Sequence, residues 1–302
     1  MTKIERFILY PLLVGLLILF AFYDLPIMQA LYDQSNWFGR AGELIGEAPL
    51  QLLGVVAGLW LFRFRDKSTK KRSVWFGVLF AFVALAFAAY GGGQIWMYLK
   101  NKYTTYTWRP GVWIAFPVAA LYLLAGGLIA FLPKISNGKE AKVFSYYVII
   151  IYVGIILLMN LFKFVWDRPR WRALVYDTDN PVAGFVPWYK ISFDGHFTDA
   201  EASFPSGHTM NALAWMILGC SSTFIDKLKG KEWIIRLSAY VWAILVAVSR
   251  TIRGAHFPSD TTAGFLICLL FIDLMTTFFW PTFRKKLGCQ NSPTPSEETK
   301  AA

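Results

Sequence analysis

Two short motifs in the C-terminal half of this 302-residue chain combine histidines with residues that bind anions. The first is the Pro-Ser-Gly-His run at 205–208, and the second runs from Arg250 through His256 to Asp260. The chain contains only three histidines, and these motifs hold two of them. Histidine can attack or protonate a phosphate group, and arginine can hold the phosphate oxygens. The two motifs therefore predict a phosphate site.

The second motif contains a nucleophile and a group to orient it. Arg250 supplies a planar guanidinium, which matches a phosphoryl group through paired hydrogen bonds. Asp260 follows His256 by four residues. A carboxylate that accepts a hydrogen bond from one imidazole nitrogen leaves the other nitrogen free to attack and stabilises the imidazolium that forms. We therefore predict that His256 is the nucleophile; the alternative, an interfacial ion-pair cluster of Arg250, Arg253 and Asp260, would not account for two histidines.

The first motif opens an apolar stretch and predicts the start of a helix. Helix starts leave backbone N–H groups unsatisfied at the positive end of the dipole, and such ends bind phosphate. Gly207 lets an anion approach the backbone closely, and the hydroxyl of Ser206 can add a donor. His208 would then lie beside the anion. The alternative is a simple helix cap with an interfacial histidine.

Further cations follow the apolar stretch that precedes these motifs. Lys163 and Arg170 are seven residues apart, nearly two helical turns, so a continuous helix would place them on one face. Pro169 is expected to end the helix, because it restricts the residue before it. In either conformation the two cations can converge on one anion, whereas the alternative is that they only snorkel to the membrane interface.

The elements that must position these residues are membrane helices. The chain is 56% hydrophobic and 16% charged, which is too apolar for an ordinary soluble domain. We predict an all-α, polytopic membrane helix bundle with about eight transmembrane helices, and at least about six, since roughly 20 apolar residues cross a bilayer. The apolar stretches lie at 7–23, 47–62, 74–98, 113–133, 143–163, 208–226, 232–249 and 260–281.

The basic residues predict the orientation of the bundle, because Lys and Arg in short loops stay on the cytoplasmic side. Basic segments such as 63–72 and 134–142 all fall on one side of an eight-span arrangement. The acidic 24–46 loop and the site residues fall on the other side, so we expect an active site outside the cytoplasm, in the cell (plasma or inner) membrane. The basic 100–112 loop does not fit. The net charge of +11 is explained by topology and contact with the lipid bilayer, without a nucleic-acid partner.

The three motifs resemble those of the type-2 phosphatidic acid phosphatase superfamily, integral membrane lipid phosphatases whose phosphate site is shared by the vanadium haloperoxidases. The motifs at 205–208 and 250–260 are complete, and a third motif, which precedes them in the chain, is kept as Lys163, six residues and Arg170. Trp171 stands where the family has proline. The resemblance covers a phosphatase core at 143–281. About four apolar spans precede it at 1–142, and the polar composition of the chain's end predicts a disordered cytoplasmic tail at 282–302.

The resemblance implies that His256 attacks phosphorus to give a phosphohistidine while Asp260 orients it, and that His208 protonates the leaving oxygen. It also implies which residues hold the phosphoryl oxygens: Lys163, Arg170, Ser206, Gly207 and Arg250. No metal or other cofactor is required, because fixed cations can supply the electrostatic stabilisation that phosphoryl transfer needs. A zinc site made by the two histidines and Asp260 is disfavoured, since the surrounding cations would repel a dication.

The expected substrate is a membrane lipid, either a lipid phosphate or an isoprenoid pyrophosphate. In a bacterium, the resemblance makes undecaprenyl pyrophosphate and phosphatidylglycerol phosphate candidates. Two alternatives stay open: a lipid phosphotransferase that uses the same phosphohistidine, and a non-catalytic protein that binds or transports anionic lipids. The long 172–204 loop, which contains His196, is expected to cover the site or to lie at the membrane interface. The oligomeric state is not predicted.

Overall fold

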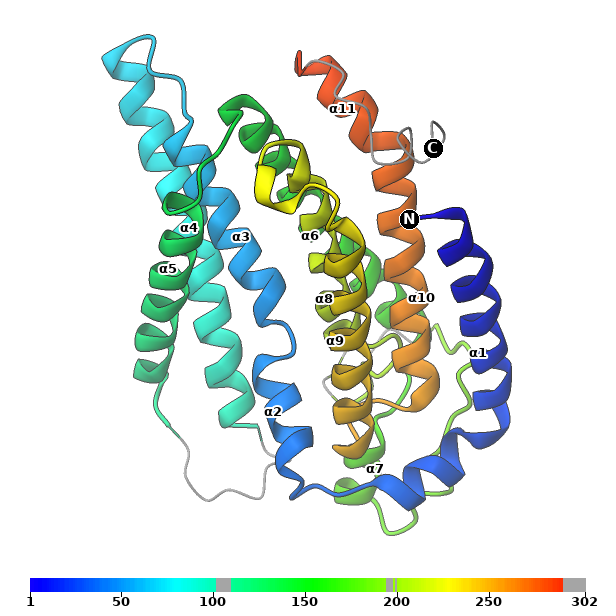
Figure 1. Cartoon of the computed structure of the whole chain (residues 1–302). Coiled ribbons are helices and arrows are strands. Elements are labelled where there is room, and N and C mark those ends of the chain that lie inside the picture. The colour runs from blue at the N-terminus through cyan, green and yellow to red at the C-terminus, as the bar shows by residue number, and fades with distance from the viewer. Residues whose placement is uncertain (102–109, 194–197, 199, 290–302) are drawn as a thin grey trace.

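The computed structural model describes residues 1–101, 110–193, 198 and 200–289, and these residues form helices without any strand. Seven helical stretches are long and apolar enough to cross a membrane, which confirms the predicted all-α membrane bundle. In chain order the elements are α1 (Lys3–Leu31), α2 (Trp37–Ile45), α3 (Ala48–Arg63), α4 (Lys70–Leu99), η1 (Val112–Ile114), α5 (Ala115–Phe131), α6 (Gly138–Trp166), α7 (Trp171–Asp177), α8 (Gly207–Ala214), η2 (Trp215–Thr223), η3 (Asp226–Leu228), α9 (Glu232–Ile252), α10 (Pro258–Leu274), η4 (Met275–Phe279) and α11 (Trp280–Lys286) (Figure 1).

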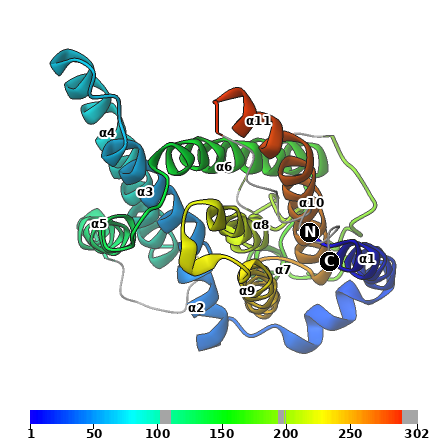
Figure 2. The same ribbon diagram turned by 45° about the horizontal axis from the view of Figure 1, so that its top comes forward.

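The predicted span at 208–226 differs from the other seven. It consists of the short helix α8, which continues as the 3₁₀ helix η2. A 3₁₀ helix rises further per residue than an α-helix, so a short segment still covers a long distance along the bundle. Every residue of α8 is buried. It packs against α3, α6, α9 and α10, and Figure 2 shows it inside the group of helices that surrounds it.

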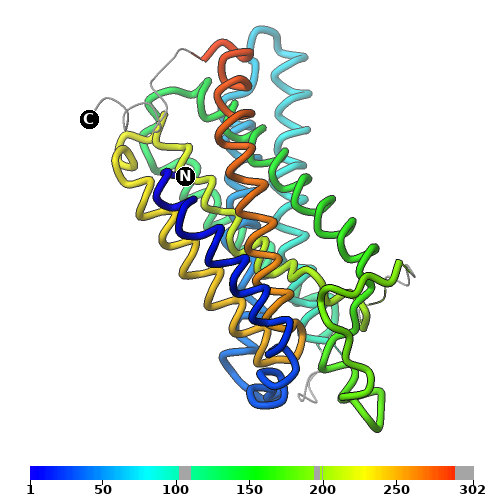
Figure 3. Tube along the Cα trace, turned by 90° about the vertical axis from the view of Figure 1, so that its right-hand side faces the viewer, coloured from blue at the N-terminus to red at the C-terminus, as the bar shows by residue number. Residues whose placement is uncertain are grey.

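The N-terminal helices form two groups on opposite sides of this centre. α3, α4 and α5 pack on one another, and α3 joins them to α6 and α8. α1 instead lies along α10 on the far side of the bundle, as Figure 3 shows. The short helix α2 packs against α9. The segment at 24–46, expected to be a surface loop, is therefore mostly helical and in part packed into the structure.

The outer surface of the bundle carries many large apolar side chains. Examples at least half exposed are Phe7, Phe22, Phe82, Leu121, Leu157 and Val241. Soluble monomers rarely expose apolar patches of such extent, whereas a surface that faces lipid requires them. The exposed residues therefore agree with a bundle that lies in a bilayer.

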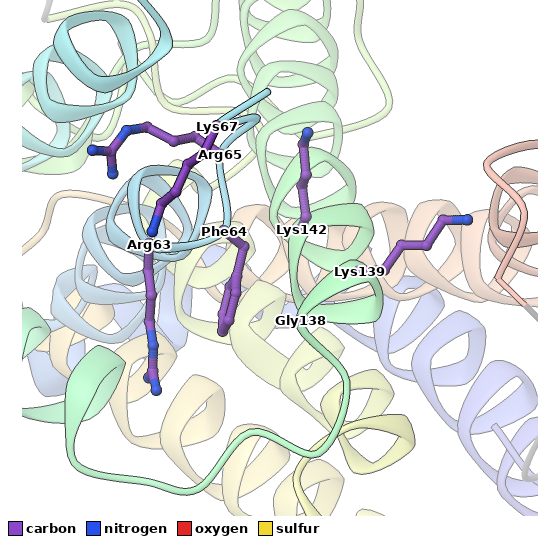
Figure 4. A pocket seen from close by; sticks show the side chains of 7 residues that line it. All are labelled: Arg63, Phe64, Arg65, Lys67, Gly138, Lys139 and Lys142. Atoms are coloured by element: carbon purple, nitrogen blue, oxygen red, sulfur yellow. The ribbon is translucent and has the colours of Figure 1, made fainter. Parts of the chain in front are cut away.

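Basic residues gather at one end of the bundle. The start of α6 and the segment after α3 line a cavity of about 470 Å³ there, with Arg63, Arg65, Lys67, Lys139 and Lys142 in its wall (Figure 4). The side chains point in different directions rather than toward one centre. Arg63 donates to the carbonyl of Ala130 at 2.8 Å, and Lys139 donates to that of Gly288 at 2.8 Å. Arg63 and Lys139 therefore bind carbonyls at or just beyond helix ends, where the helix dipole favours positive charge.

The first residues of the predicted disordered tail are helical. The helix continues beyond residue 281 to Lys286, and Arg284 makes a two-pronged ion pair with Glu140 at the start of α6. This contact explains why the chain stays helical there. Residues 290–302, the remainder of the predicted tail, lie outside the described residues.

Candidate active site

The motif residues meet at the end of the bundle opposite the basic cavity. Lys163 lies in the last turn of α6, and Arg250 lies in the last turn of α9. His208 lies in the first turn of α8, and Asp260 in the first turn of α10. The ends of these four helices come together near α7 (Figure 1). The three motifs, which are far apart in sequence, therefore form one site.

A tight turn between α9 and α10 positions His256. Gly254 has φ +63°, a conformation that favours glycine. A Cβ at this position would also lie 2.6 Å from the ring of Tyr32. The N–H of Arg172 donates to the Gly254 carbonyl at 2.8 Å, which fixes the turn against α7. This turn needs glycine for both its backbone conformation and its packing.

His256 is buried, and one of its ring nitrogens has a backbone partner. Its Nδ1 lies 2.7 Å from the carbonyl oxygen of Ser203. A carbonyl can only accept, so Nδ1 carries the hydrogen and Nε2 keeps its lone pair. The Asp260 carboxylate is 4.0 Å from Nδ1, so the direct hydrogen bond expected from the sequence is absent from this structure. Ser203 takes that place, and its carbonyl was not predictable from residue types because every residue has one.

Asp260 acts on His256 through its neighbours. Its carboxylate accepts from the hydroxyl of Ser203 at 2.6 Å and from the N–H of Phe257 at 2.7 Å. It also accepts from Nη1 of Arg168 at 2.5 Å. These bonds hold the residue that follows His256 in the chain and the residue that accepts its Nδ1 hydrogen. The aspartate therefore positions the imidazole indirectly.

Arg168 and Arg170 have different surroundings. Arg168 is fully buried and donates to Val186, Ser259 and Asp260, and to Asp24 on α1 at 3.0 Å. All three of its guanidinium nitrogens are therefore engaged by protein atoms. Arg170 donates from Nη2 to the carbonyl of Ala202 at 3.2 Å. Because protein atoms engage the whole guanidinium of Arg168, Arg170 is the better candidate to bind phosphate.

The helix end before these arginines follows the sequence pattern. α6 ends at Trp166, and Asp167 adopts a left-handed conformation with φ 45° just before Arg168 and Pro169. The indole of Trp171, at the position where the family has proline, is buried against Met28, Leu174 and Phe257. Packing against α1 therefore accounts for tryptophan at this position.

Positive charge surrounds His256. Burial, followed by the charges of Arg170, Arg250 and Lys163, holds the pKa of this imidazole well below its ordinary value. The same three cations are those that the sequence assigns to the phosphoryl oxygens. Their joint effect on one imidazole means that positive charge is near the predicted nucleophile, which favours binding of an anion there.

The start of α8 closes one side of the site. Ser206 caps the helix, and its hydroxyl accepts from the N–H of Thr209 at 3.4 Å. Its own N–H donates to the carbonyl of Asp260 at 2.9 Å, which joins α8 to α10. A Cβ on Gly207 would lie 2.3 Å from the sulfur of Met159, so close packing also requires glycine there. Whether Ser206 and Gly207 bind phosphate stays a prediction.

Four arginines surround one buried carboxylate that the sequence analysis did not single out. Glu43 of α2 lies 3.2 Å from Nη1 of Arg250 and 3.0 Å from Nη1 of Arg172. Its second oxygen lies 2.6 Å from Arg40 and 3.4 Å from Arg253. The arginine predicted to bind phosphate is therefore held by a residue of the N-terminal region.

His208 also faces the N-terminal region. Its Nε2 lies 3.2 Å from the carbonyl of Glu43, and its Nδ1 lies 3.5 Å from the carboxylate of Glu47. The ring of Tyr98 lies 5.0 Å away. Three carboxylates near the site, those of Asp24, Glu43 and Glu47, were therefore not identified from the sequence. A sequence signal was present, since single carboxylates beside membrane spans are costly unless they have a role.

Within the described residues, no group of three or more His, Cys, Asp or Glu side chains is arranged to hold a metal ion. His196, expected to be a solvated loop residue, lies outside the described residues. In the same long segment, Trp188 contacts two helices. Its carbonyl accepts from the indole of Trp166 in α6, and its own indole donates to the carbonyl of Leu17 in α1. Part of the segment after α7 therefore packs on α6 and α1.

Comparisons with known proteins match the part of the chain that contains these residues. Residues 142–284 match the PAP2 superfamily. The chain is 37% identical over 130 residues to "Phosphatidylglycerophosphatase B" of Bacillus subtilis (strain 168), a match that covers 40% of this chain and 62% of that protein. It is 31% identical over 77 residues to "Phosphatidylglycerophosphatase B" of Haemophilus influenzae (strain ATCC 51907 / DSM 11121 / KW20 / Rd), covering 25% of this chain and 32% of that protein.

These matches cover less than two thirds of either relative, and no solved structure matches the chain. The family match includes every residue that the sequence assigned to the site, from Lys163 to Asp260. It leaves out α1 to α5, which supply Asp24, Glu43 and Glu47. The part of the chain from residue 142 to residue 284 thus matches the PAP2 superfamily, the superfamily of the type-2 phosphatidic acid phosphatases.

Proposed function

We propose that this protein is a membrane phosphatase that removes the terminal phosphate of a lipid phosphate through a phosphohistidine on His256. The observation that carries the proposal is the environment of this residue. Its Nδ1 is bound to the carbonyl of Ser203, and the cations at 163, 170 and 250 act on the same ring. A neutral imidazole with a free Nε2 next to three cations is suited to attack a phosphate whose charge those cations neutralise.

In the first step, Nε2 of His256 forms a bond to phosphorus as the bond to the lipid oxygen breaks. His208 gives its proton to that oxygen, because an alkoxide is a poor leaving group. The positive charge that develops on His256 is stabilised through Ser203 and Asp260. Lys163, Arg170 and Arg250 hold the other phosphate oxygens throughout.

In the second step, water attacks the phosphorus and the bond to Nε2 breaks. His208, now neutral, takes a proton from the water and is ready for another cycle. His256 returns to its neutral form as phosphate leaves. Each proton and electron pair is accounted for by the two histidines, the lipid and water.

The preferred substrate within this proposal is phosphatidylglycerol phosphate. Both relatives are named phosphatidylglycerophosphatase B, and the candidate residues lie at one end of the bundle, the level at which lipid headgroups would lie in a surrounding bilayer. The basic end of the bundle lies opposite to the site, so the positive-inside rule supports a site that faces away from the cytoplasm.

Trapping the covalent intermediate tests the mechanism. Native protein and His256→Asn are mixed briefly with phosphatidylglycerol phosphate labelled in its terminal phosphate, and the reaction is stopped in alkali. A phosphohistidine survives alkali and is lost in acid. Label of this kind on the native protein alone supports the mechanism, whereas label on both proteins, or turnover by both, contradicts it.

A further inference from the structure

His208 takes its ring contacts from residues that precede the family domain. Its Nε2 lies 3.2 Å from the carbonyl of Glu43, its Nδ1 lies 3.5 Å from Oε1 of Glu47, and the ring of Tyr98 lies 5.0 Å away. These three residues belong to α2, the α2–α3 junction and α4, all before residue 142. These ring contacts of the predicted proton donor therefore come from outside the residues that match the family.

The side chain of Glu47 is a buried carboxylate that does not cap its own helix. It occupies the N-cap position of α3, but its side chain makes no capping hydrogen bond. It is 9% exposed, and its Oε2 has no hydrogen-bond partner among the described residues. Burying a carboxylate is costly unless it is paired, so a glutamate here requires a reason other than the stability of α3.

The position of Glu47 supplies such a reason. Its near neighbours in the site include the polar side chain of Asn211 and the cations Arg250 and Lys163, which are close enough to act on its charge. A carboxylate beside an imidazole stabilises the protonated ring and fixes its orientation. A general acid needs both effects, and catalytic hydrogen bonds that are long in an unliganded site tighten when the substrate binds.

We propose that Glu47 is the positioning residue of His208: it holds Nδ1 of the protonated imidazole, so that Nε2 can exchange the Glu43 carbonyl for the leaving oxygen of the substrate and donate to it. The inference deepens the proposed function and rests on it. It assigns to the α2–α3 segment a part in the chemistry, in addition to its part in the bundle. The chemical step that Glu47 serves is the breaking of the bond from phosphorus to a lipid alkoxide, not the binding of phosphate.

Two substrates with different leaving groups separate this role from a structural one. Phosphatidylglycerol phosphate leaves a lipid alkoxide, which needs a proton, whereas p-nitrophenyl phosphate leaves a nitrophenolate, which departs without one. Glu47→Gln keeps the size of the side chain and removes its charge. Because hydrolysis of the phosphohistidine is common to both substrates, the comparison uses kcat/KM, which reports the steps up to departure of the leaving group. We expect kcat/KM for the lipid to fall by about 10- to 100-fold and kcat/KM for the aryl phosphate to change by less than about 3-fold.

A matched control removes a buried carboxylate elsewhere. Glu140→Gln breaks the buried pair with Arg284 at the opposite end of the bundle. It should leave the ratio of the two kcat/KM values unchanged, even if it lowers stability. Equal losses for both substrates in Glu47→Gln, or no loss for either, would overturn the inference.

A double-mutant cycle covers the case in which Glu47→Gln folds poorly. The loss caused by Glu47→Gln, and the smaller loss expected for Glu47→Asp, should disappear in a His208→Ala background, since a positioning residue acts only through its partner. Full additivity of these losses with His208→Ala would contradict the inference. If the native enzyme hydrolyses neither substrate, the proposed function fails and the inference fails with it. If the native enzyme is active but the Glu47 variants behave as the control does, only the inference fails.

Discussion

The carboxylate of Glu43 lies 3.2 Å from Nη1 of Arg250, so the arginine predicted to bind the substrate phosphate rests on an anion from a different part of the chain. Three more arginines share this carboxylate, at distances of 2.6 to 3.4 Å. Four cations around one anion leave an excess of positive charge next to the site. That excess favours a phosphate, which carries more negative charge than the carboxylate can supply.

Removing the Glu43 carboxylate should destabilise the protein. Glu43→Ala leaves four neighbouring arginines without their shared anion, and breaking a buried pair in this way costs about 3–5 kcal/mol. The thermal midpoint in detergent should fall clearly. The control is Asp226→Ala, which breaks an exposed pair with Lys229 and should cost about 0–1 kcal/mol. Equal midpoints for the two variants would contradict the importance of the Glu43 cluster.

Arg168 and Arg170 should give opposite results when each is changed to methionine. Arg168→Met leaves Asp24 and Asp260 without their common partner, so we expect a loss of stability of about 3–5 kcal/mol. Arg170→Met should fold, and its rate of phosphate release should fall by about 100-fold, because a cation that stabilises the transition state is lost. Thermal unfolding and initial rates measure the two effects. A folded, inactive Arg168→Met beside an active Arg170→Met would reverse the assignment.

The acid side of the pH profile should report His256. This residue must be neutral to attack, and burial together with nearby cations lowers its pKa from the ordinary value of 6.5. The acid limb of kcat/KM should therefore lie below pH 6.5, since the imidazole stays neutral to lower pH. Arg170→Met removes one of those cations, so its acid limb should move to higher pH. An acid limb of kcat/KM at or above pH 6.5 in the native enzyme would contradict the assignment of this limb to His256.

The same pKa shift has a consequence for stability. The unfolded chain takes up a proton on this histidine near pH 6.5, whereas the folded chain does so only at lower pH. The contribution of His256 to stability is therefore present above pH 6.5 and declines as the pH falls below it. Unfolding of the native protein and of His256→Gln across this range should differ in slope, with the native protein losing more stability toward acid.

The orientation of the bundle can be tested by labelling single cysteines. Lys67→Cys places a thiol in the wall of the basic cavity, and Tyr189→Cys places one at an exposed position in the segment that follows α7. The three native cysteines are first replaced by alanine. A membrane-impermeant maleimide added to intact bacterial spheroplasts should label the cysteine at 189 and not that at 67. The reverse pattern would place the site on the cytoplasmic side.

The sequence predicted the features that depend on local pattern. Apolar stretches gave the positions of the helices, and the motif residues lie at helix ends because Pro169 and Gly254 end or turn the chain there. The tight spacing from Arg250 to Asp260 spans one helix end, one turn and one helix start, so its geometry follows from its sequence.

The sequence could not predict the contacts between distant segments. Glu43 and Arg250 are more than 200 residues apart, and no pattern within either helix pairs them. The partner of His256 is the backbone of Ser203, which residue types do not reveal. The distance of 4.0 Å from Asp260 shows that a motif can identify the right residues while the hydrogen bond between them runs through a third.

The most direct test of the central claim is phosphate release from phosphatidylglycerol phosphate, measured for purified native protein and for His256→Ala with EDTA present in both. We predict steady release by the native protein that the chelator does not lower, and no release above background by a folded His256→Ala. Release by the variant at a comparable rate, or loss of native activity that Mg²⁺ or Zn²⁺ restores, would contradict a metal-independent phosphohistidine mechanism.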